Sequence, residues 1–286
     1  MSIHDQNYVR YEGSLREGAA WWIIAMSSLR LYWSFLRTKL VLLLLWIFPL
    51  VMGVLIVVEY AVRQQMAQMA GDFEPMSGAI AFFMQMEIFA LALLFVASGC
   101  GAISDDLRHR TFQLYFSKPL SRWEYGVGKF LGLFFLGSLV TVAPALLLGL
   151  LRTAFYFQTD HLATIAKWGS LTVLLSVGLT AIVCLVVLGL SSLTRRTGYV
   201  VLAFIGVLLV PLILHGIVAV ATGGEDYALL WSLPGNVVLI TETVLGIGSE
   251  EGRNIPVWAP FAVVAVLGAA GLGSLVRRVT RLEGVA

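Results

Sequence analysis

Charged residues are scarce in this chain of 286 amino acids, where Asp, Glu, Lys and Arg together make up 13% of the sequence. Soluble domains carry about a quarter of their residues as charges, so the scarcity excludes a soluble globular enzyme. The net charge is only +2, which is too small to indicate nucleic acid as a partner. Cysteine is equally rare. Cys100 and Cys184 both lie in apolar runs, which favours packed thiols over a disulfide framework.

Motifs for catalysis and metal binding are also missing from the sequence. The four histidines show no metal-ligand spacing, and no grouping of Ser, His and Asp indicates an intramembrane protease. The Gly-Val-Gly-Lys run at 126–129 is not a phosphate loop, because a Walker A motif needs Gly-x4-Gly-Lys-Ser/Thr. Trp123 and Phe130 occupy the positions that require Gly and Ser or Thr. We therefore expect no enzymatic activity and no cofactor in this chain.

Apolar residues, in contrast, make up 59% of the chain and gather in long runs. A bilayer core of about 30 Å needs roughly twenty apolar residues in a helix. Six segments reach that length, and they predict an all-α integral membrane protein with six transmembrane helices. These segments are 40–59, 80–103, 127–151, 168–193, 198–221 and 256–276.

The distribution of basic residues predicts the orientation of the spans. Fifteen of the nineteen Lys and Arg residues fall on the side that holds the N-terminus, and four fall on the other side. Because basic residues accumulate on the cytoplasmic side, both termini are expected there, in a bacterial or archaeal cytoplasmic membrane. The predicted regions are an N-terminal part (1–39), a membrane domain (40–276) and a cytoplasmic tail (277–286). The polar, aromatic start does not resemble a cleavable signal peptide, so the first span is expected to direct insertion.

Two segments outside the predicted spans are expected to lie at the membrane surfaces. Residues 14–38 combine a Ser14–Glu17 capping box with Trp, Tyr and Arg side chains. This pattern indicates an interfacial helix along the inner surface, and an ordinary juxtamembrane anchor is an equal alternative. The segment 222–255 contains an apolar run that is too short to cross the membrane. It predicts a short re-entrant helix on the outer side.

The connector between the second and third spans, residues 104–126, has an unusual composition. Charges at the end of a span, such as Arg108, are usually only solvated. Exposed apolar patches on a cytosolic loop, however, tend to mark interaction sites. The apolar patch of the connector consists of Phe112, Leu114, Tyr115 and Phe116. We therefore expect the connector to dock against a partner, with simple solvation as the alternative.

The second half of the connector shows a helix break followed by a helix start. Pro119 interrupts any preceding helix because proline lacks the backbone N–H. Ser121 and Glu124 then form a capping box that begins the next helix. The predicted shape is a helix, a break and a second helix that project from the bilayer.

One carboxylate lies well inside a predicted span. Glu87, beside Gln85, is about two helical turns from the outer end of the second span. Intramembrane ionisable residues are costly and mark possible pathways, so these two residues are candidates for a transport path. The alternative is that Glu87 extends toward the headgroup region.

Small residues at four-residue spacing predict close helix packing at two places. The first is the pair Gly128 and Gly132, and the second is the series Ala265, Ala269 and Gly273. Small side chains allow the backbones of neighbouring membrane helices to approach closely.

The order of residues in the connector resembles the first cytoplasmic loop of ABC-2-type transporter permeases. In that family, an acidic pair follows the second span, then a Thr with an apolar patch, then Ser-x-Pro-Leu-Ser-Arg, and finally Gly-Lys. The corresponding residues here are Asp105 and Asp106, 111–116, 117–122 and 128–129. The sequence departs from the family at Asp106, which is commonly Glu, and at Arg110, which is commonly Gly.

The resemblance implies that the connector is a coupling helix that sits in a groove of an ATP-binding subunit. It also implies an interfacial helix before the first span and short re-entrant helices on the outer side. The residues that it places at the ATP-binding subunit are Asp105, Asp106, Arg108, Thr111, Phe112, Leu114, Tyr115, Phe116, Pro119, Arg122 and Glu124.

The function implied by the resemblance is that of a permease subunit of an ATP-binding cassette exporter. Its expected partners are two ATP-binding subunits, which bind ATP and Mg, a second permease copy or a paralogue, and membrane lipids. The alternative is a non-ABC secondary transporter or a membrane scaffold. The sequence shows no internal repeat, which counts against an inverted-repeat secondary transporter.

Overall fold

A computed structural model of the chain describes residues 20–66, 77–109, 111, 121–157, 162–222, 226–246 and 255–282. The described residues form helices and contain no strand, so the protein is an all-α membrane protein, as the sequence predicts. Five helical segments are long and apolar enough to cross a membrane. There are six such segments when the bent pair 123–138 and 142–155 is taken as one span.

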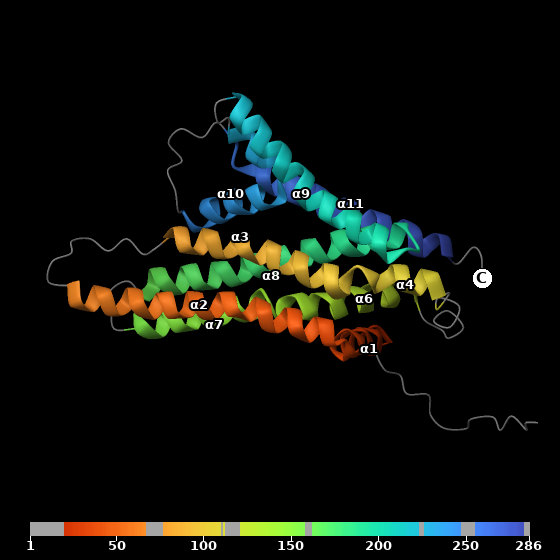
Figure 1. The fold of residues 1–286 in the computed structure, drawn as a ribbon, viewed down its shortest axis with the longest axis horizontal. Helices are drawn as coiled ribbons and strands as arrows, with labels where there is room; N and C mark the ends of the chain where they lie inside the picture. Colours follow the sequence, from red (N-terminus) through yellow and green to blue (C-terminus); the bar gives the residue numbers. More distant parts are fainter. Residues whose placement is uncertain are drawn as a thin grey trace, which may run out of the picture.

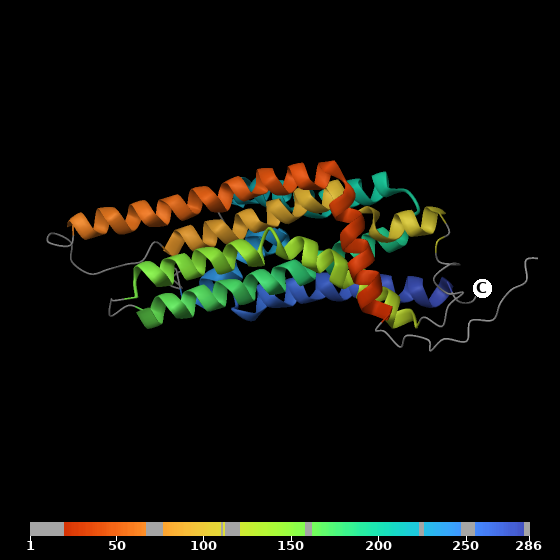
Figure 2. The same cartoon turned by 90° about the horizontal axis from the view of Figure 1, so that it is seen from below.

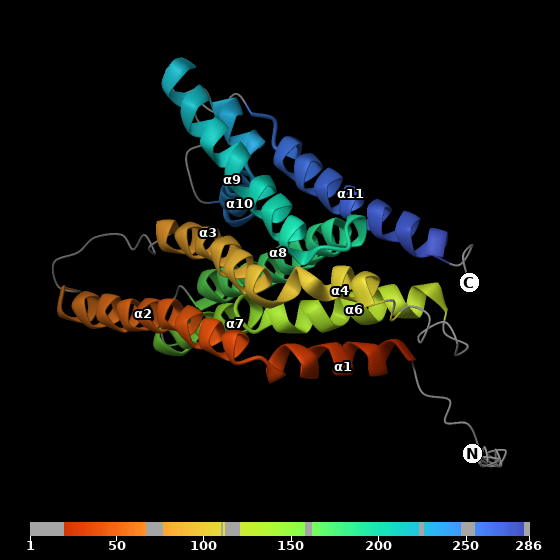
Figure 3. The same ribbon diagram turned by 45° about the vertical axis from the view of Figure 1, so that its right-hand side comes forward.

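Most of the helices run roughly along one direction in a bundle, and α9 and α11 incline away from the rest (Figures 1 and 3). Their bounds are α1 (Ala20–Ser34), α2 (Leu36–Met66), α3 (Ser77–Leu94), η1 (Phe95–Gly99), α4 (Gly101–His109), α6 (Arg122–Ser138), α7 (Val142–Phe155), α8 (Leu162–Leu193), α9 (Thr197–Thr222), η2 (Asp226–Trp231), α10 (Leu233–Leu245) and α11 (Trp258–Leu282).

The elements α3, η1 and α4 form one continuous span, 79–109. Within it, η1 is a π-helical turn, closed by a hydrogen bond of 2.8 Å from the Cys100 amide to the Phe95 carbonyl. Such π-turns widen the helix locally and leave backbone groups without their usual partners. The predicted span 80–103 therefore continues for six further residues, to the end of α4, which carries the connector.

The third predicted span is broken into α6 and α7, with a bend of 40° between them. Pro144 lies in the first turn of α7, where it cannot donate a hydrogen bond to Val140. The Thr141 hydroxyl stabilises the break by donating to the Gly137 carbonyl at 3.2 Å. Pro49 and Pro211, by comparison, lie inside the continuous helices α2 and α9.

The helix α8 is the centre of the bundle, and it contacts α3, α4, α6, α7, α9, α10 and α11. Its closest neighbour is α11, where the backbones approach at Gly189 and Gly271. A Cβ atom on Gly189 would lie 2.6 Å from the Gly271 Cα atom. The close helix packing predicted for Ala265, Ala269 and Gly273 is wrong among the described residues. Ala265 and Ala269 are exposed, and a Cβ atom on Gly273 would meet no atom within 4 Å.

The N-terminal helix α1 crosses the bundle at a steep angle and packs on α6 (Figure 2). The predicted packing at Gly128 and Gly132 is confirmed here. A Cβ atom on Gly128 would lie 2.7 Å from the Ile24 Cβ, and one on Gly132 would lie 2.9 Å from the Ser28 Cβ. The described helix begins at Ala20, so the Ser14–Glu17 capping box lies outside the described residues.

The segment between α9 and α11 contains the short apolar helix α10, which packs against α3, α9 and α11. Its start is capped by the Ser232 hydroxyl, which accepts a hydrogen bond of 3.1 Å from the Gly235 amide. Its end is formed by Gly246, whose φ of 66° is in the left-handed region that favours glycine. The position of this helix agrees with the short helix expected within 222–255, and its depth in a membrane remains a prediction.

The segments that the charge distribution predicts to be cytoplasmic lie at one end of the bundle. The end of α4, the start of α6, the α8–α9 turn and the end of α11 are together there, near α1 (Figures 1 and 3). The end of α2 and the α7–α8 turn lie at the opposite end. We call the first the connector end and the second the far end.

Candidate functional site

The candidate site is the connector end of α4, which carries the two predicted acidic residues. This short helix has one apolar face, on which Ile103 and Leu107 are buried. Asp105 is exposed and Asp106 is half-buried. The two carboxylates therefore point in different directions, and each contacts a different neighbouring helix.

Asp106 joins α4 to α6. The Lys129 ammonium lies 2.7 Å from Asp106 Oδ2, and the Tyr125 hydroxyl donates a hydrogen bond of 2.7 Å to the same oxygen. Both partners are buried, with Lys129 5% exposed and Tyr125 fully covered. A charged lysine is retained in such a place because the carboxylate compensates for its lost hydration.

Asp105 joins α4 to α9. Thr197, the first residue of α9, donates a hydrogen bond of 2.6 Å from its hydroxyl to Asp105 Oδ1. The hydroxyls of Ser104 and Thr197 lie 3.1 Å apart and form a second hydrogen bond between the two helices. The start of α9 is thus tied to the same helix end as α6.

Ser191 of α8 fills the gap that the π-turn leaves in the second span. Its hydroxyl donates to the Cys100 carbonyl at 2.9 Å and accepts from the amides of Ile103 and Ser104 at 3.0 and 2.9 Å. The first amides of a helix lack intrahelical acceptors, so Ser191 acts as a cap supplied by another helix. Helix α4 is therefore held at its start by α8, and further along by α9 and α6 through Asp105 and Asp106.

The connector itself is described only at its two ends. Thr111 closes the end of α4, because its amide and hydroxyl donate to the Asp106 carbonyl at 3.1 and 3.2 Å. The predicted capping box is confirmed: Glu124 N donates to Ser121 Oγ at 3.3 Å, and Ser121 N donates to Glu124 Oε2 at 2.8 Å. The predicted docking residues outside the described residues are Phe112, Leu114, Tyr115, Phe116 and Pro119.

The remaining predicted docking residues are two arginines. Arg122 is the first residue of α6, and its side chain lies outside the described part. Arg108 is exposed and lines a concave surface with Arg195 and Arg196 of the α8–α9 turn. The connector end therefore presents a basic surface next to the point where the connector leaves the bundle.

The predicted pathway residue Glu87 lies inside the bundle and does not extend toward the headgroups. Its side chain is 2% exposed and accepts a hydrogen bond of 2.8 Å from the Ser176 hydroxyl of α8. Its second oxygen, Oε2, has no hydrogen-bond partner among the described residues. Gln85, two residues earlier, is half-buried on another face of the helix. The structure thus places Glu87 against α8, and its role in a pathway remains a prediction.

The sequence alone did not reveal Lys129, Tyr125, Ser191 and Thr197 as members of this site. Lys129 and Tyr125 follow α4 across the connector, and Ser191 and Thr197 lie more than 80 residues away along the chain. A Ser or Thr in an apolar run is a weak signal, because such hydroxyls usually bond to the preceding helical turn.

Comparison with known proteins identifies the family. A comparison with curated proteins found no match. The family described as ABC-2 family transporter protein matches residues 33–231, which include α2 to α9 and the whole connector. This match covers more than half of the chain, and the helical fold agrees with it. The chain belongs to the ABC-2 family of transporter proteins and is a multi-pass membrane component of a transport system.

Proposed function

We propose that the chain is the membrane-spanning subunit of an exporter driven by a separate ATP-binding subunit. Two copies, or one copy and a paralogue, would combine with two ATP-binding subunits that bind ATP and Mg. The observation that carries this proposal is the anchored end of α4. The connector leaves the bundle from a short helix that is bonded to α6 and α9 through Asp106 and Asp105 and to α8 at its start.

This anchoring provides a physical route for coupling. A displacement of the connector moves the end of α4, and the Asp106–Lys129 pair passes that displacement to α6. The Asp105–Thr197 hydrogen bond passes it to the start of α9. ATP binding can drive a change of state only if the partner binds the two states with different affinity. A helix end shared by several spans is suited to that task, because a small shift there alters the packing of the whole bundle.

The alternative function is a transporter or scaffold that works without an ATP-binding partner. Family membership counts against it, and so does the apolar composition of residues 112–116 in the connector. The alternative predicts that the connector is only solvated and that its side chains are interchangeable with polar ones.

The test removes two side chains of the connector and leaves the bundle intact. Tyr115→Ala combined with Arg122→Ala should release the ATP-binding subunit or uncouple its hydrolysis from transport. Aromatic and Arg residues are typical interface anchors, and the loss of one costs about 2 kcal/mol or more. Association is measured by pull-down of the tagged chain with its ATP-binding subunit, and coupling by ATPase activity in reconstituted membranes.

The matched control also removes one aromatic and one basic side chain. Phe157→Ala combined with Lys167→Ala changes two exposed residues at the far end. This control should retain both association and ATPase activity, and both proteins should insert at equal levels. Wild-type behaviour of the connector variant in both assays would favour the alternative function.

A further inference from the structure

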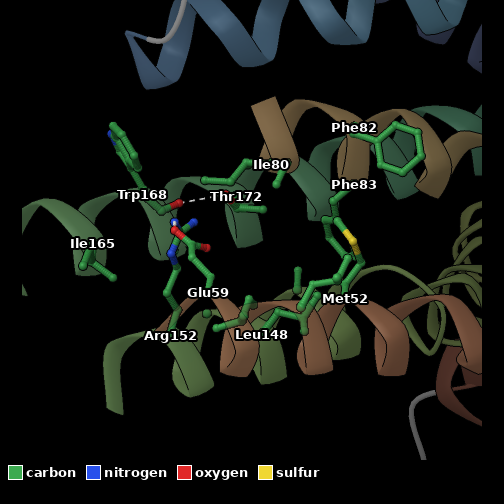
Figure 4. A pocket seen from close by; sticks show the side chains of 16 residues that line it. Met52, Glu59, Ile80, Phe82, Phe83, Leu148, Arg152, Ile165, Trp168 and Thr172 are labelled. Atoms are coloured by element: carbon green, nitrogen blue, oxygen red, sulfur yellow. Dashed lines mark hydrogen bonds and ion pairs between the residues drawn. The ribbon is translucent and has the colours of Figure 1, made fainter. Parts of the chain in front are cut away.

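An apolar cavity of about 330 Å³ opens between α2, α3, α7 and α8 at the far end of the bundle. Its walls are mainly aliphatic and aromatic, with Ile80, Phe83 and Leu148 among the side chains that face it (Figure 4). The volume is within the range of about 300 to 1,000 Å³ that small-molecule sites occupy. The site described above lies at the other end, so the cavity has no part in anchoring the connector.

The cavity has one charged end, formed by Arg152 of α7 and Glu59 of α2 (Figure 4). Arg152 Nη2 lies 3.8 Å from Glu59 Oε1, which is an ion-pair distance but too long for a hydrogen bond. Arg152 is only 9% exposed, and its Nε and Nη2 atoms have no hydrogen-bond partner among the described residues. Leaving buried donors without acceptors costs free energy. The two unpaired nitrogens of Arg152 are therefore suited to a bound ligand that accepts hydrogen bonds.

The missing acceptor is best supplied by an anion. A guanidinium presents planar, paired donors whose geometry matches a phosphate or a carboxylate. The ligand must also fill the long apolar part of the cavity, which requires a hydrocarbon chain. Trp168 lies at the same end as Arg152, and tryptophan favours the depth of lipid headgroups.

We infer that this cavity is a binding site for an anionic membrane phospholipid, whose phosphate contacts Arg152 and one of whose acyl chains lies between α2, α3, α7 and α8. Phosphate and hydrocarbon then occupy the charged and apolar parts of the site at the same time. The site does not depend on the proposed function, because binding of the lipid needs neither an ATP-binding subunit nor transport.

The test uses the purified chain in phosphatidylcholine vesicles that contain phosphatidylglycerol with a diazirine at the end of one acyl chain. After illumination, mass spectrometry locates the labelled peptides. We expect labels on the cavity walls of α3 and α7, at a much higher level than with a phosphatidylcholine probe of the same chain length. Equal labelling by the two probes, or labels only on outward-facing residues, would refute a site for anionic lipid.

Variants separate the charge from the cavity. Arg152→Gln should lower labelling by phosphatidylglycerol about tenfold, the effect of losing one charge-assisted hydrogen bond, and Arg152→Lys should retain most of it. The double variant Glu59→Gln, Arg152→Gln should show the same loss of labelling as Arg152→Gln. The loss would then not be caused by a Glu59 carboxylate left without its arginine. Lys167→Gln, an exposed cation outside the cavity, is the matched control and should leave labelling unchanged.

A cavity-filling variant keeps the test independent of charge. Ala79 lines the cavity, and Ala79→Phe should reduce labelling of the walls by both probes without altering the charged end. Undiminished labelling in Ala79→Phe would show that the acyl chain of the lipid does not enter the cavity.

Discussion

Asp106 shows how a single acidic side chain can hold two membrane helices together. Its Oδ2 atom accepts a hydrogen bond of 2.7 Å from the Tyr125 hydroxyl and forms an ion pair with the Lys129 ammonium, also at 2.7 Å. The side chain of Asp106 is 15% exposed, so its charge is only partly screened by solvent. Removing one member of a buried ion pair is far more costly than removing both, because the remaining charge keeps its desolvation penalty.

This asymmetry gives a prediction for the pair. Lys129→Met should destabilise the protein by about 1–3 kcal/mol, and the further change Asp106→Asn should restore part of that loss. The measurement is the unfolding free energy in detergent, determined for both single variants and the double variant. Arg195→Met, which removes an exposed cation at the same end, is the control and should change stability by less than about 0.5 kcal/mol.

The result would decide whether the pair is structural. If Lys129→Met is as stable as the wild type, or the double variant is the least stable of the three, Asp106 does not depend on its lysine. The acidic pair would then be available to a partner, as the family resemblance implies.

The sequence predicted the acidic pair at the span end but not what its carboxylates contact. Tyr125 is 19 residues from Asp106 along the chain, and Thr197 is 92 residues from Asp105. Local patterns contain no information on such partners, because they depend on how the helices pack. The Ser121–Glu124 capping box is different. Its hydrogen bonds join residues three positions apart, so the sequence alone was sufficient to predict it.

At the level of elements, the sequence predicted the spans better than their interruptions. Hydropathy located an apolar run for each crossing segment, because burial in lipid requires one. Pro49, Pro144 and Pro211 each lie within a predicted span, and of these three only Pro144 coincides with a break in the helix. At that break, the Thr141 hydroxyl lies 2.7 Å from the Thr180 hydroxyl of α8, so a contact from another helix supports the bend. The π-turn at 95–99 had no local sequence signal either, and Ser191 of α8 donates a hydrogen bond to the Cys100 carbonyl directly after it.

The packing of α1 on α6 gives a prediction for these two elements. Gly128→Ala would place a methyl group 2.7 Å from the Ile24 Cβ and 2.8 Å from the Trp21 carbonyl oxygen. Such overpacking costs about 1–3 kcal/mol, so α1 should loosen from α6. Hydrogen exchange of the α1 amides, followed by mass spectrometry, should become faster.

The matched control is Gly126→Ala, on the same helix. A Cβ atom at Gly126 meets no atom within 4 Å, so the same change of residue should leave α1 unaffected. Equal exchange rates in the two variants would mean that α1 does not rest on α6 at Gly128.

For the whole molecule, the anchored helix α4 lies at the connector end of the bundle and the apolar cavity lies at the far end. The longest helix, α8, has 32 residues and is about 48 Å long at 1.5 Å per residue, which exceeds the bilayer core of about 30 Å. The least buried spans are α2 and α9, with 11% and 17% of their most apolar windows covered. Their outer faces are available to lipid or to a second permease copy.

The orientation of the whole bundle can be tested with single cysteines. Arg195 lies in the exposed α8–α9 turn at the connector end, and Phe157 is 68% exposed at the far end. The two native cysteines, Cys100 and Cys184, are buried and should contribute little background. Because fifteen of the nineteen basic residues fall on the connector side, that side should face the cytoplasm. A membrane-impermeant thiol reagent should therefore label Phe157→Cys in intact cells, and Arg195→Cys only after the membrane is opened. The reverse pattern would place the connector outside the cell, away from ATP, and would overturn the proposed coupling to an ATP-binding subunit while leaving the helical fold unaffected.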